Sequence, residues 1–224
     1  MIEAEAEQVG APLFRCGVEW DAFASQGRLL VHTASRALDL SLPALNGAHQ
    51  IENAGLACAA LMHWRSDLTD DAFERGVSNA KLPARLQALT RGPLSAPVRA
   101  LGGEVWVDGG HNAHATAALV RWSTSRQTSR SAPLVVIFGS RARKDWAMSL
   151  KPLAAMADLV IASSLSEGVD PALIASLARS QGAASVAAAS LEEAMQKAAQ
   201  LPAPRVLICG SFLLAAQALA LENA

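Results

Sequence analysis

Five short apolar runs alternate with amphipathic segments in the part of the chain that follows residue 104. The runs cover residues 105–108, 134–139, 159–162, 185–187 and 206–210, and helices are expected to begin near Asn112, Asp145, Asp170 and Ser190 and after Ser211. This alternation is typical of βα repeats, whose strands form a mostly parallel sheet flanked by helices. We therefore predict an α/β fold here, with residues 85–89 adding an edge strand.

The earlier residues have a less regular pattern. Short strands in a hairpin-rich region are predicted at residues 11–17 and 28–42, the end of a helix at residues 2–9, and a long apolar helix at residues 50–64. Thr69 is expected to cap a further helix. Because Lys81-Leu82-Pro83-Ala84 interrupts the pattern, we predict two domains, at residues 1–82 and 83–224.

The composition indicates a compact globular protein and argues against two classes of partner. Of the 224 residues, 51% are hydrophobic and 17% charged, and the formal net charge is -1. Scattered basic residues make a nucleic-acid partner unexpected, and the longest apolar stretch, residues 206–221, is too short and too interrupted to cross a membrane. Three cysteines at unrelated spacings indicate buried thiols in a reducing compartment. Because no basic and apolar leader is present, we expect a cytoplasmic protein.

The segment Asp108-Gly109-Gly110-His111-Asn112 follows the first of the predicted parallel strands. Ligands of parallel α/β sheets bind beyond the carboxyl ends of the strands, which is where Asp108 and His111 are expected. The two glycines allow a sharp turn and a close approach by a ligand or by another segment. The alternative interpretation of these residues is a structural turn in which Asn112 caps the next helix.

Side chains suited to a nucleotide also occur before this segment. His49 and Asn53 are four residues apart at the start of a predicted helix, so that both project from one face. Such a pair is able to hold a base or a phosphate, although a structural pair remains an alternative. Arg85 follows a proline-containing turn and precedes a strand, where its guanidinium is expected to reach phosphate oxygens. A surface arginine with no ligand is the alternative.

Polar residues also follow two later strands of the predicted sheet. Lys144 and Asp145 lie just beyond residues 134–139, and Ser211 follows Gly210 at the end of the last strand. The hydroxyl and amide of Ser211 are suited to a carboxylate. Lys144 and Asp145 are either part of the ligand-binding edge or a loop cation beside a helix cap.

Several motifs of known chemistry are missing from the sequence. Asp108, His111 and His114 lack a further ligand at the spacing of a tetrahedral metal site, so no metal site is predicted within the chain. The sequence around Ser211 lacks the second glycine of a hydrolase nucleophile turn. No G-x-x-x-x-G-K-[ST] phosphate loop and no G-x-G-x-x-G dinucleotide loop is present.

Taken together and in order, these motifs resemble the folylpolyglutamate synthase and dihydrofolate synthase family of the muramyl-ligase superfamily. The matching segments are Gly47-Ala48-His49-Gln50-Ile51-Glu52-Asn53-Ala54, Leu82-Pro83-Ala84-Arg85-Leu86-Gln87, Val107-Asp108-Gly109-Gly110-His111-Asn112, Lys144-Asp145 and Gly210-Ser211. The similarity covers essentially the whole chain, and the order of five motifs makes it specific. Ala113 departs from the proline that usually follows His-Asn, and Gly110 departs from the usual alanine.

The resemblance implies an enzyme that phosphorylates a carboxylate with ATP and lets the amino group of L-glutamate attack the acyl phosphate. Its substrates are dihydropteroate or folates, and Mg²⁺ accompanies ATP. By resemblance, Asn53, Arg85 and Asp108 contact ATP, and His111 and Ser211 face the nucleotide edge or the incoming glutamate. His49, Lys144 and Asp145 are further possible site residues.

The family's phosphate loop, magnesium ligands and modified lysine have no counterpart in these 224 residues. The resemblance therefore implies a carboxyl-terminal portion, in which a remnant of the central ATPase domain precedes the complete glutamate-side domain. In the parent ligase, which we expect to be a monomer, ATP and Mg²⁺ would be held mainly by the preceding domain. We expect the 224 residues alone to be inactive. The alternatives are another muramyl-type amino-acid ligase and a nucleotide-binding module without catalysis.

Overall fold

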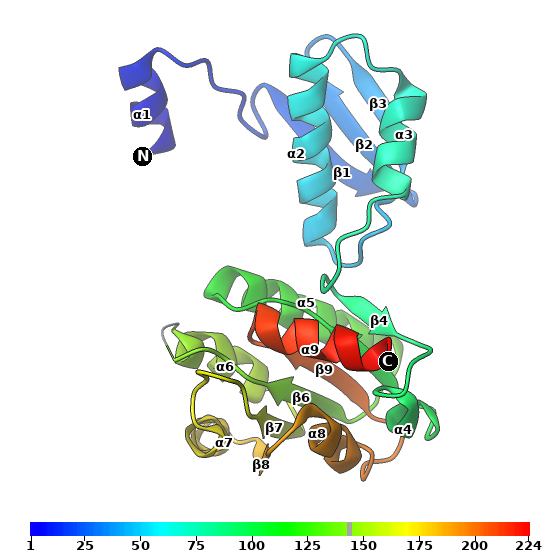
Figure 1. Cartoon of the computed structure of the whole chain (residues 1–224). Helices are drawn as coiled ribbons and strands as arrows, with labels where there is room; N and C mark the ends of the chain where they lie inside the picture. Colours follow the sequence, from blue (N-terminus) through cyan, green and yellow to red (C-terminus); the bar gives the residue numbers. More distant parts are fainter. Residues whose placement is uncertain (143–144) are drawn as a thin grey trace. The chain divides into compact units, whose positions relative to one another are not determined.

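The computed structural model describes residues 1–142 and 145–224, and it divides into two compact units, Met1–Lys81 and Leu82–Ala224 (Figure 1). Unit 1 contains helices α1 (Ile2–Val9), α2 (His49–Trp64) and α3 (Asp70–Ser78) and strands β1 (Trp20–Ser25), β2 (Arg28–Thr33) and β3 (Ala37–Ser41). The three strands form an antiparallel sheet in the order β1-β2-β3.

The core of unit 1 lies between this sheet and the helices α2 and α3 (Figure 1). Leu29 and Leu40 of the sheet are buried in the same cluster as Cys58 of α2 and Phe73 of α3. A Cβ atom at Gly55 would lie 2.2 Å from the Cβ of Ala22, so a glycine is needed for α2 to approach β1 this closely. The apolar side chains that α2 and α3 turn toward the sheet thus form one core.

One strand of unit 1 differs from the sequence-based expectation. Residues 11–17 were predicted to form a strand, but the only pairing among them in the described chain is an isolated bridge from Cys16 to Trp20. Gly17 adopts a φ of 77° and its N–H donates to the carbonyl oxygen of Trp20 at 2.7 Å, so the chain turns here. The first strand is instead β1, whose apolar and polar residues alternate too weakly to have been identified.

Unit 2 is an α/β domain with a six-stranded sheet. Its strands are β4 (Gln87–Leu89), β5 (Glu104–Val107), β6 (Leu134–Phe138), β7 (Leu159–Ser163), β8 (Ala184–Ala188) and β9 (Arg205–Cys209), and its helices are α4 (Ala96–Arg99), α5 (Ala113–Ser129), α6 (Trp146–Ala154), α7 (Pro171–Ser180), α8 (Leu191–Ala198) and α9 (Phe212–Glu222). The strand order is β4-β5-β9-β6-β7-β8, and only β4 pairs antiparallel to its neighbour. The predicted mostly parallel sheet flanked by helices is confirmed.

Four strands of the unit 2 sheet, β5, β6, β7 and β9, are buried on both faces. Alternate strand residues such as Val107 and Ile208 pack in one cluster with residues of α4, α8 and α9. Their chain neighbours, such as Trp106 and Leu207, pack in a second cluster with residues of α5, α6 and α7. Because both faces are covered, the strands are continuous apolar runs, which explains why the sequence predicted them.

The ends of most helices follow the capping pattern expected from the sequence. The side chains of Thr69, Asn112, Asp170 and Ser190 each accept a backbone N–H in the first turn of α3, α5, α7 and α8. These bonds satisfy amide groups that a helix leaves without an internal partner. Within the described residues, no helix has both the length and the apolar character needed to span a membrane.

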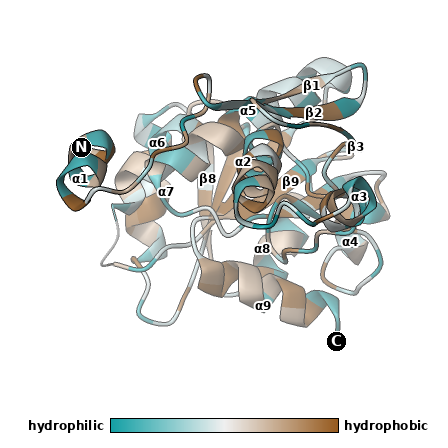
Figure 2. Ribbon diagram, turned by 90° about the horizontal axis from the view of Figure 1, so that it is seen from above, coloured by the Kyte–Doolittle hydropathy of each residue, from teal (hydrophilic) through white to brown (hydrophobic). Residues whose placement is uncertain are grey.

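The final helix is fixed at its carboxyl end by a carboxylate. Helix α9 is mostly white and brown in Figure 2, which marks neutral and hydrophobic residues, and it turns teal at its end. There Glu222, which is buried, accepts hydrogen bonds from the N–H of Gly92 at 2.8 Å and from the N–H and hydroxyl of Ser95 at 2.9 and 2.7 Å. Burial raises the pKa of Glu222, but these bonds outweigh it and the pKa is lowered. Glu222 thus links α9 to the segment before α4.

Candidate functional site

The loops that follow β5 and β9 meet at the carboxyl edge of the parallel sheet. The two strands are neighbours, with Val107 paired to Ile208. Beyond them, the N–H of Gly210 donates to the carbonyl oxygen of Gly110 at 2.9 Å. The segments Asp108-Gly109-Gly110-His111 and Gly210-Ser211 are therefore adjacent, at the edge where ligands of such sheets bind.

Asp108 connects this edge to the segment that contains Arg85. Its side chain is buried, its Oδ1 accepts the N–H of Gly110 at 2.6 Å, and its Oδ2 accepts the N–H of Leu86 at 2.8 Å. The N–H of Gly109 in turn donates to the carbonyl oxygen of Ala84 at 2.8 Å. The backbone on both sides of Arg85 is thus bonded to the loop after β5.

The residues that flank Arg85 have unusual backbone conformations. Ala84 and Leu86 adopt φ values of 57° and 41°, in the left-handed region that residues other than glycine rarely occupy. The strand predicted to start at residue 85 starts at Gln87 instead, because these conformations cannot continue a strand. Strained residues persist where surrounding bonds hold them, and such positions are concentrated at functional sites. The bonds from Asp108 and Gly109 provide that restraint here.

The side chain of Arg85 extends over an aromatic ring. Its Cζ lies 4.9 Å from the ring centroid of Phe212, and in the described part of the chain its guanidinium forms no ion pair. His111 meets the same ring edge-on, with centroids 4.9 Å apart, and its Nδ1 lies 2.9 Å from the carbonyl oxygen of Gly109. A guanidinium that forms no ion pair within residues 1–142 and 145–224 and an imidazole are therefore gathered around one phenylalanine.

Gly109 is required by this arrangement. A Cβ atom at this position would lie 2.3 Å from Cδ1 of Phe212 and 3.3 Å from Nη1 of Arg85. Real Cβ atoms do not approach a ring carbon so closely, so any other residue would displace the ring. The sequence predicted a close approach at this glycine but did not identify Phe212; the only signal was its place directly after Gly210-Ser211 at a strand end.

Ser211 and Asp145 serve as helix caps at the same edge. The buried hydroxyl oxygen of Ser211 accepts the N–H of Leu213 at 3.1 Å, and Asp145 Oδ1 accepts the N–H of Met148 at 3.3 Å. Lys144, the neighbouring predicted residue, lies outside the described residues. The described contacts thus account for Ser211 and Asp145 as helix caps. Contact of either residue with a ligand stays a prediction.

The two predicted residues of unit 1 lie at the start of α2. Asn53 Nδ2 donates to Oε1 of the buried Gln50 at 3.1 Å, and Gln50 Nε2 lies 3.0 Å from Nε2 of His49. Gln50 therefore links His49 and Asn53, a connection that the sequence analysis missed. The exposed Asn53 and the half-buried His49 present polar atoms near the amino end of the helix.

The described residues do not fit a magnesium site. Among residues 1–142 and 145–224, no group of three histidine, cysteine, aspartate or glutamate side chains is placed to hold a metal ion. Asp108, the carboxylate nearest the candidate site, uses both oxygens to accept backbone N–H groups. We therefore assign no step of a reaction to a metal held by these residues.

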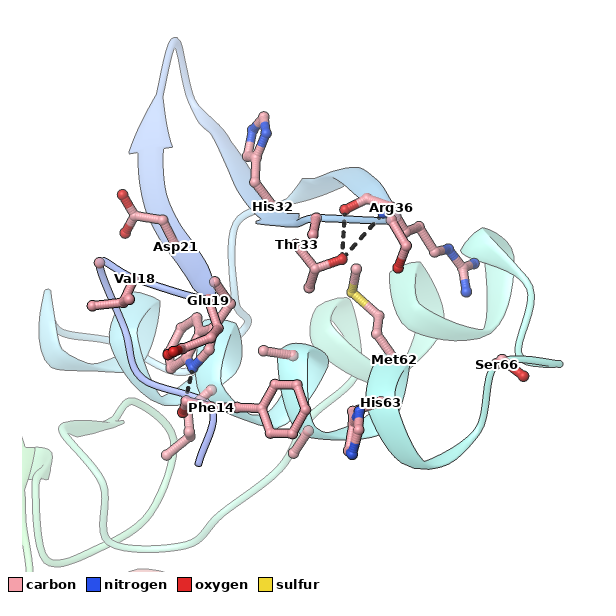
Figure 3. Close-up of a pocket in the computed structure, with 17 residues that line it drawn as sticks. Phe14, Val18, Glu19, Asp21, His32, Thr33, Arg36, Met62, His63 and Ser66 are labelled. Carbon is pink, nitrogen blue, oxygen red and sulfur yellow. Dashed lines mark hydrogen bonds between the residues drawn. The ribbon is translucent and has the colours of Figure 1, made fainter. Parts of the chain in front are cut away.

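A large cavity in unit 1 contains none of the predicted site residues. Its volume is about 1120 Å³, and Phe14, His32, Arg36, Met62 and His63 are among the side chains that line it (Figure 3). The ring of Phe14 lies 3.9 Å from that of His63, and Arg36 is bonded to the carbonyl oxygen of Leu68 at 2.8 Å. Because the residues singled out by the sequence lie elsewhere, we place the candidate site at the edge of the unit 2 sheet.

Comparisons with known proteins agree with the fold of unit 2. Residues 97–212 match the family model described as Mur ligase, glutamate ligase domain. A probable bifunctional folylpolyglutamate synthase/dihydropteroate synthase of Haloferax volcanii is 29% identical over 199 residues, which cover 86% of this chain and 22% of that protein. The chain thus spans less than a quarter of the length of this curated relative.

Two solved structures extend the similarity to the whole chain. The bifunctional folylpolyglutamate synthase/dihydrofolate synthase of Yersinia pestis complexed with AMPPNP and Mn is 24% identical, with a TM-score of 0.81, over 100% of this chain and 50% of that one. A bifunctional folylpolyglutamate synthase/dihydrofolate synthase with Mn, AMPPNP and L-glutamate bound is 26% identical, with a TM-score of 0.79, over 100% and 50%. The chain therefore has the fold of about half of each.

Proposed function

The chain belongs to the family defined by the Mur ligase glutamate ligase domain, and from this premise we propose that it is part of an ATP-dependent ligase that adds L-glutamate to dihydropteroate or to folates. The similar proteins support this proposal. Two of the solved structures contain an ATP analogue, and one of these also contains L-glutamate. The phosphate loop and the magnesium ligands would be contributed by another part of such a ligase.

The proposal depends on one observation, which is that Arg85 has a restrained backbone and a guanidinium that no carboxylate among the described residues neutralises. Its backbone is restrained by Asp108 and Gly109, its guanidinium lies over Phe212, and no carboxylate in the described residues neutralises it. A guanidinium presents several donors in a fixed plane that matches phosphate oxygens. Placed at the carboxyl edge of a parallel sheet, Arg85 is suited to bind a terminal phosphate of ATP.

The proposed reaction has two steps. A carboxylate oxygen of the folate substrate attacks the terminal phosphorus of ATP, and the bond to ADP breaks; the amino group of glutamate then attacks the acyl carbon, and inorganic phosphate leaves as the amide forms. Negative charge accumulates on the transferred phosphoryl oxygens, and a positioned cation stabilises it. We assign this role to Arg85.

The other site residues receive narrower roles. Asp108 holds the Arg85 segment, and a hydroxyl of the nucleotide would donate to the same carboxylate. We propose that His111 and Ser211 lie beside the edge of the bound nucleotide or beside the incoming glutamate. In unit 1, we propose that Asn53 contacts ATP and that His49 lies nearby. ATP and Mg²⁺ remain the proposed cofactors, and L-glutamate with dihydropteroate or folate the proposed substrates.

Replacing Arg85 tests the proposed function in the 224-residue chain. Arg85→Ala is expected to weaken the binding of ATP about 10- to 100-fold, because a hydrogen bond to a charged group contributes about 1.5–3 kcal/mol. Isothermal titration calorimetry measures this affinity. Arg121→Ala, which removes an exposed arginine on α5, is the matched control and should leave it unchanged. Equal ATP affinities for the Arg85→Ala variant and the unmodified chain would contradict the phosphate role.

A further inference from the structure

We propose that Phe212 is a positioning residue whose ring orients the Arg85 guanidinium and the His111 imidazole toward the same phosphate-bearing ligand. The inference rests on the proposed function, because it deepens the role given there to Arg85. None of the similarities described above assigns a role to Phe212.

The first observation is that Phe212 is not a core residue. It occupies the first turn of α9, and 44% of its surface is exposed. Other residues of α9, namely Leu214, Ala215 and Ala218, belong to the buried cluster under the helix, whereas Phe212 belongs to neither cluster of unit 2. Its ring contacts are instead Arg85 and His111. Core packing therefore does not explain an aromatic residue at this position.

The second observation is that the backbone of Arg85 is fixed while its side chain is long. The flanking residues are held by the bonds from Asp108 and Gly109 described above. An unrestrained arginine side chain samples many rotamers, and it loses this conformational entropy when it binds a ligand. A cation 4.9 Å from the ring centroid is attracted to the ring face, which selects rotamers that place the guanidinium beside Phe212.

The third observation is that the loop after β5 leaves room for the ring. Cδ1 and Cε1 of Phe212 lie 2.3 and 2.4 Å from the position of a Cβ atom at Gly109. The carbonyl oxygen of the same glycine lies 2.9 Å from Nδ1 of His111, which orients the imidazole edge-on to the ring. Gly109 thus permits both contacts, and Gly109→Ala should disturb the same signals as a change at Phe212.

Nuclear magnetic resonance on the 224-residue chain, with labelled arginine and histidine, measures this positioning without a ligand. Because both side chains lie 4.9 Å from its ring centroid, the ring current of Phe212 is expected to displace the side-chain signals of Arg85 and His111. Phe212→Leu should move both sets of signals toward values typical of a solvated side chain, whereas Phe212→Tyr should preserve them. The signals of Arg126, which lies 4.7 Å from the ring centroid of Trp106, should stay constant and report an intact fold.

Phe14→Leu is the matched control, since Phe14 is also exposed and its ring also contacts a histidine, His63, but in unit 1. It should leave the Arg85 and His111 signals unchanged.

Titration with inorganic triphosphate is the second readout. Phe212→Leu should weaken its binding about two- to fivefold, which is the effect of losing one cation–π contact, and Phe212→Tyr should restore the affinity.

The outcomes separate this inference from the proposed function. If Phe212→Leu leaves the Arg85 signals in place, the positioning role is overturned, whatever the chain binds. If these signals shift but the unmodified chain fails to bind triphosphate, the positioning role stands and the phosphate-binding function is contradicted. A loss of triphosphate affinity that Phe212→Tyr does not restore would also count against an effect of the aromatic ring.

Discussion

Arg205→Ala is expected to lower the free energy of unfolding by about 3–5 kcal/mol, because it removes the buried partner of an ion pair together with all its hydrogen bonds and leaves a cavity beside Glu104. Arg205 is 1% exposed, at the amino end of β9, and is bonded through Nε to Glu104, the paired residue of β5. Its Nη1 and Nη2 donate to Gln127 Oε1 at 2.6 Å and to the carbonyl oxygen of Arg130 at 3.1 Å.

Glu104 is the carboxylate that loses its fully buried partner in this variant. Burial raises the pKa of Glu104, but the hydrogen bonds from Arg205 and Trp106 outweigh it and the pKa is lowered. The side chain of Trp106 donates to Glu104 Oε2 at 3.1 Å, and Arg126 does so at 3.3 Å. The network joins strands β5 and β9 to helix α5, at the opposite edge of the sheet from the candidate site.

Urea unfolding followed by circular dichroism measures the loss. Arg179→Ala is the matched control, because Arg179 is exposed and hydrogen-bonds only Ser185 among the described residues; it should cost less than about 1 kcal/mol. The double variant Glu104→Gln with Arg205→Met should recover part of the stability, because a methionine fills the space of Arg205 and the fully buried charge is gone. A stability of Arg205→Ala within about 1 kcal/mol of the unmodified chain would show that the network is not needed.

Asp108→Asn is expected to lower the free energy of unfolding by about 2–3 kcal/mol, because a charge-assisted hydrogen bond is lost and a buried donor is left without an acceptor. The carboxylate accepts from Leu86 and from Gly110, and an asparagine amide group would oppose one of these two N–H donors. The strained conformations of Ala84 and Leu86 would then relax. Binding of ATP should weaken with the loss of the Arg85 position.

Denaturant unfolding and ATP calorimetry on the same variant measure the two effects. Asp145→Asn is the matched control, since Asp145 also follows a parallel strand but is exposed and caps α6. Asparagine is as good a helix cap as aspartate, so this variant should remain as stable as the unmodified chain. An Asp108→Asn variant of unchanged stability and ATP affinity would exclude a positioning role for the carboxylate.

Much of unit 2 was predictable because its signals are local. The strands β5, β6, β7 and β9 are buried on both faces and therefore appear as apolar runs, and the caps at Asn112, Asp170 and Ser190 act within one helical turn. The position of Asp108 and Gly109 at a strand end was likewise evident from the residues themselves.

The contacts that organise the site were not predictable because they join distant segments. Leu86 meets Asp108, and Phe212 meets Arg85 and Gly109, only through the order of strands in the sheet. The positive φ values beside Arg85 have no sequence signature, since alanine and leucine rarely adopt them. The exposed ring of Phe212 resembles an ordinary apolar helix residue in the sequence, and its role is visible only from its neighbours.

The most direct test is to locate ATP on the 224-residue chain by following backbone amide signals during a titration with ATP and Mg²⁺. We predict that the signals of Arg85, Gly109, Gly110 and His111 change together and that Arg85→Ala abolishes the change. The signals of Trp20 and His63, which line the cavity of unit 1, should stay constant. Changes confined to that cavity, or none at the sheet edge at saturating ATP, would contradict the proposed phosphate site.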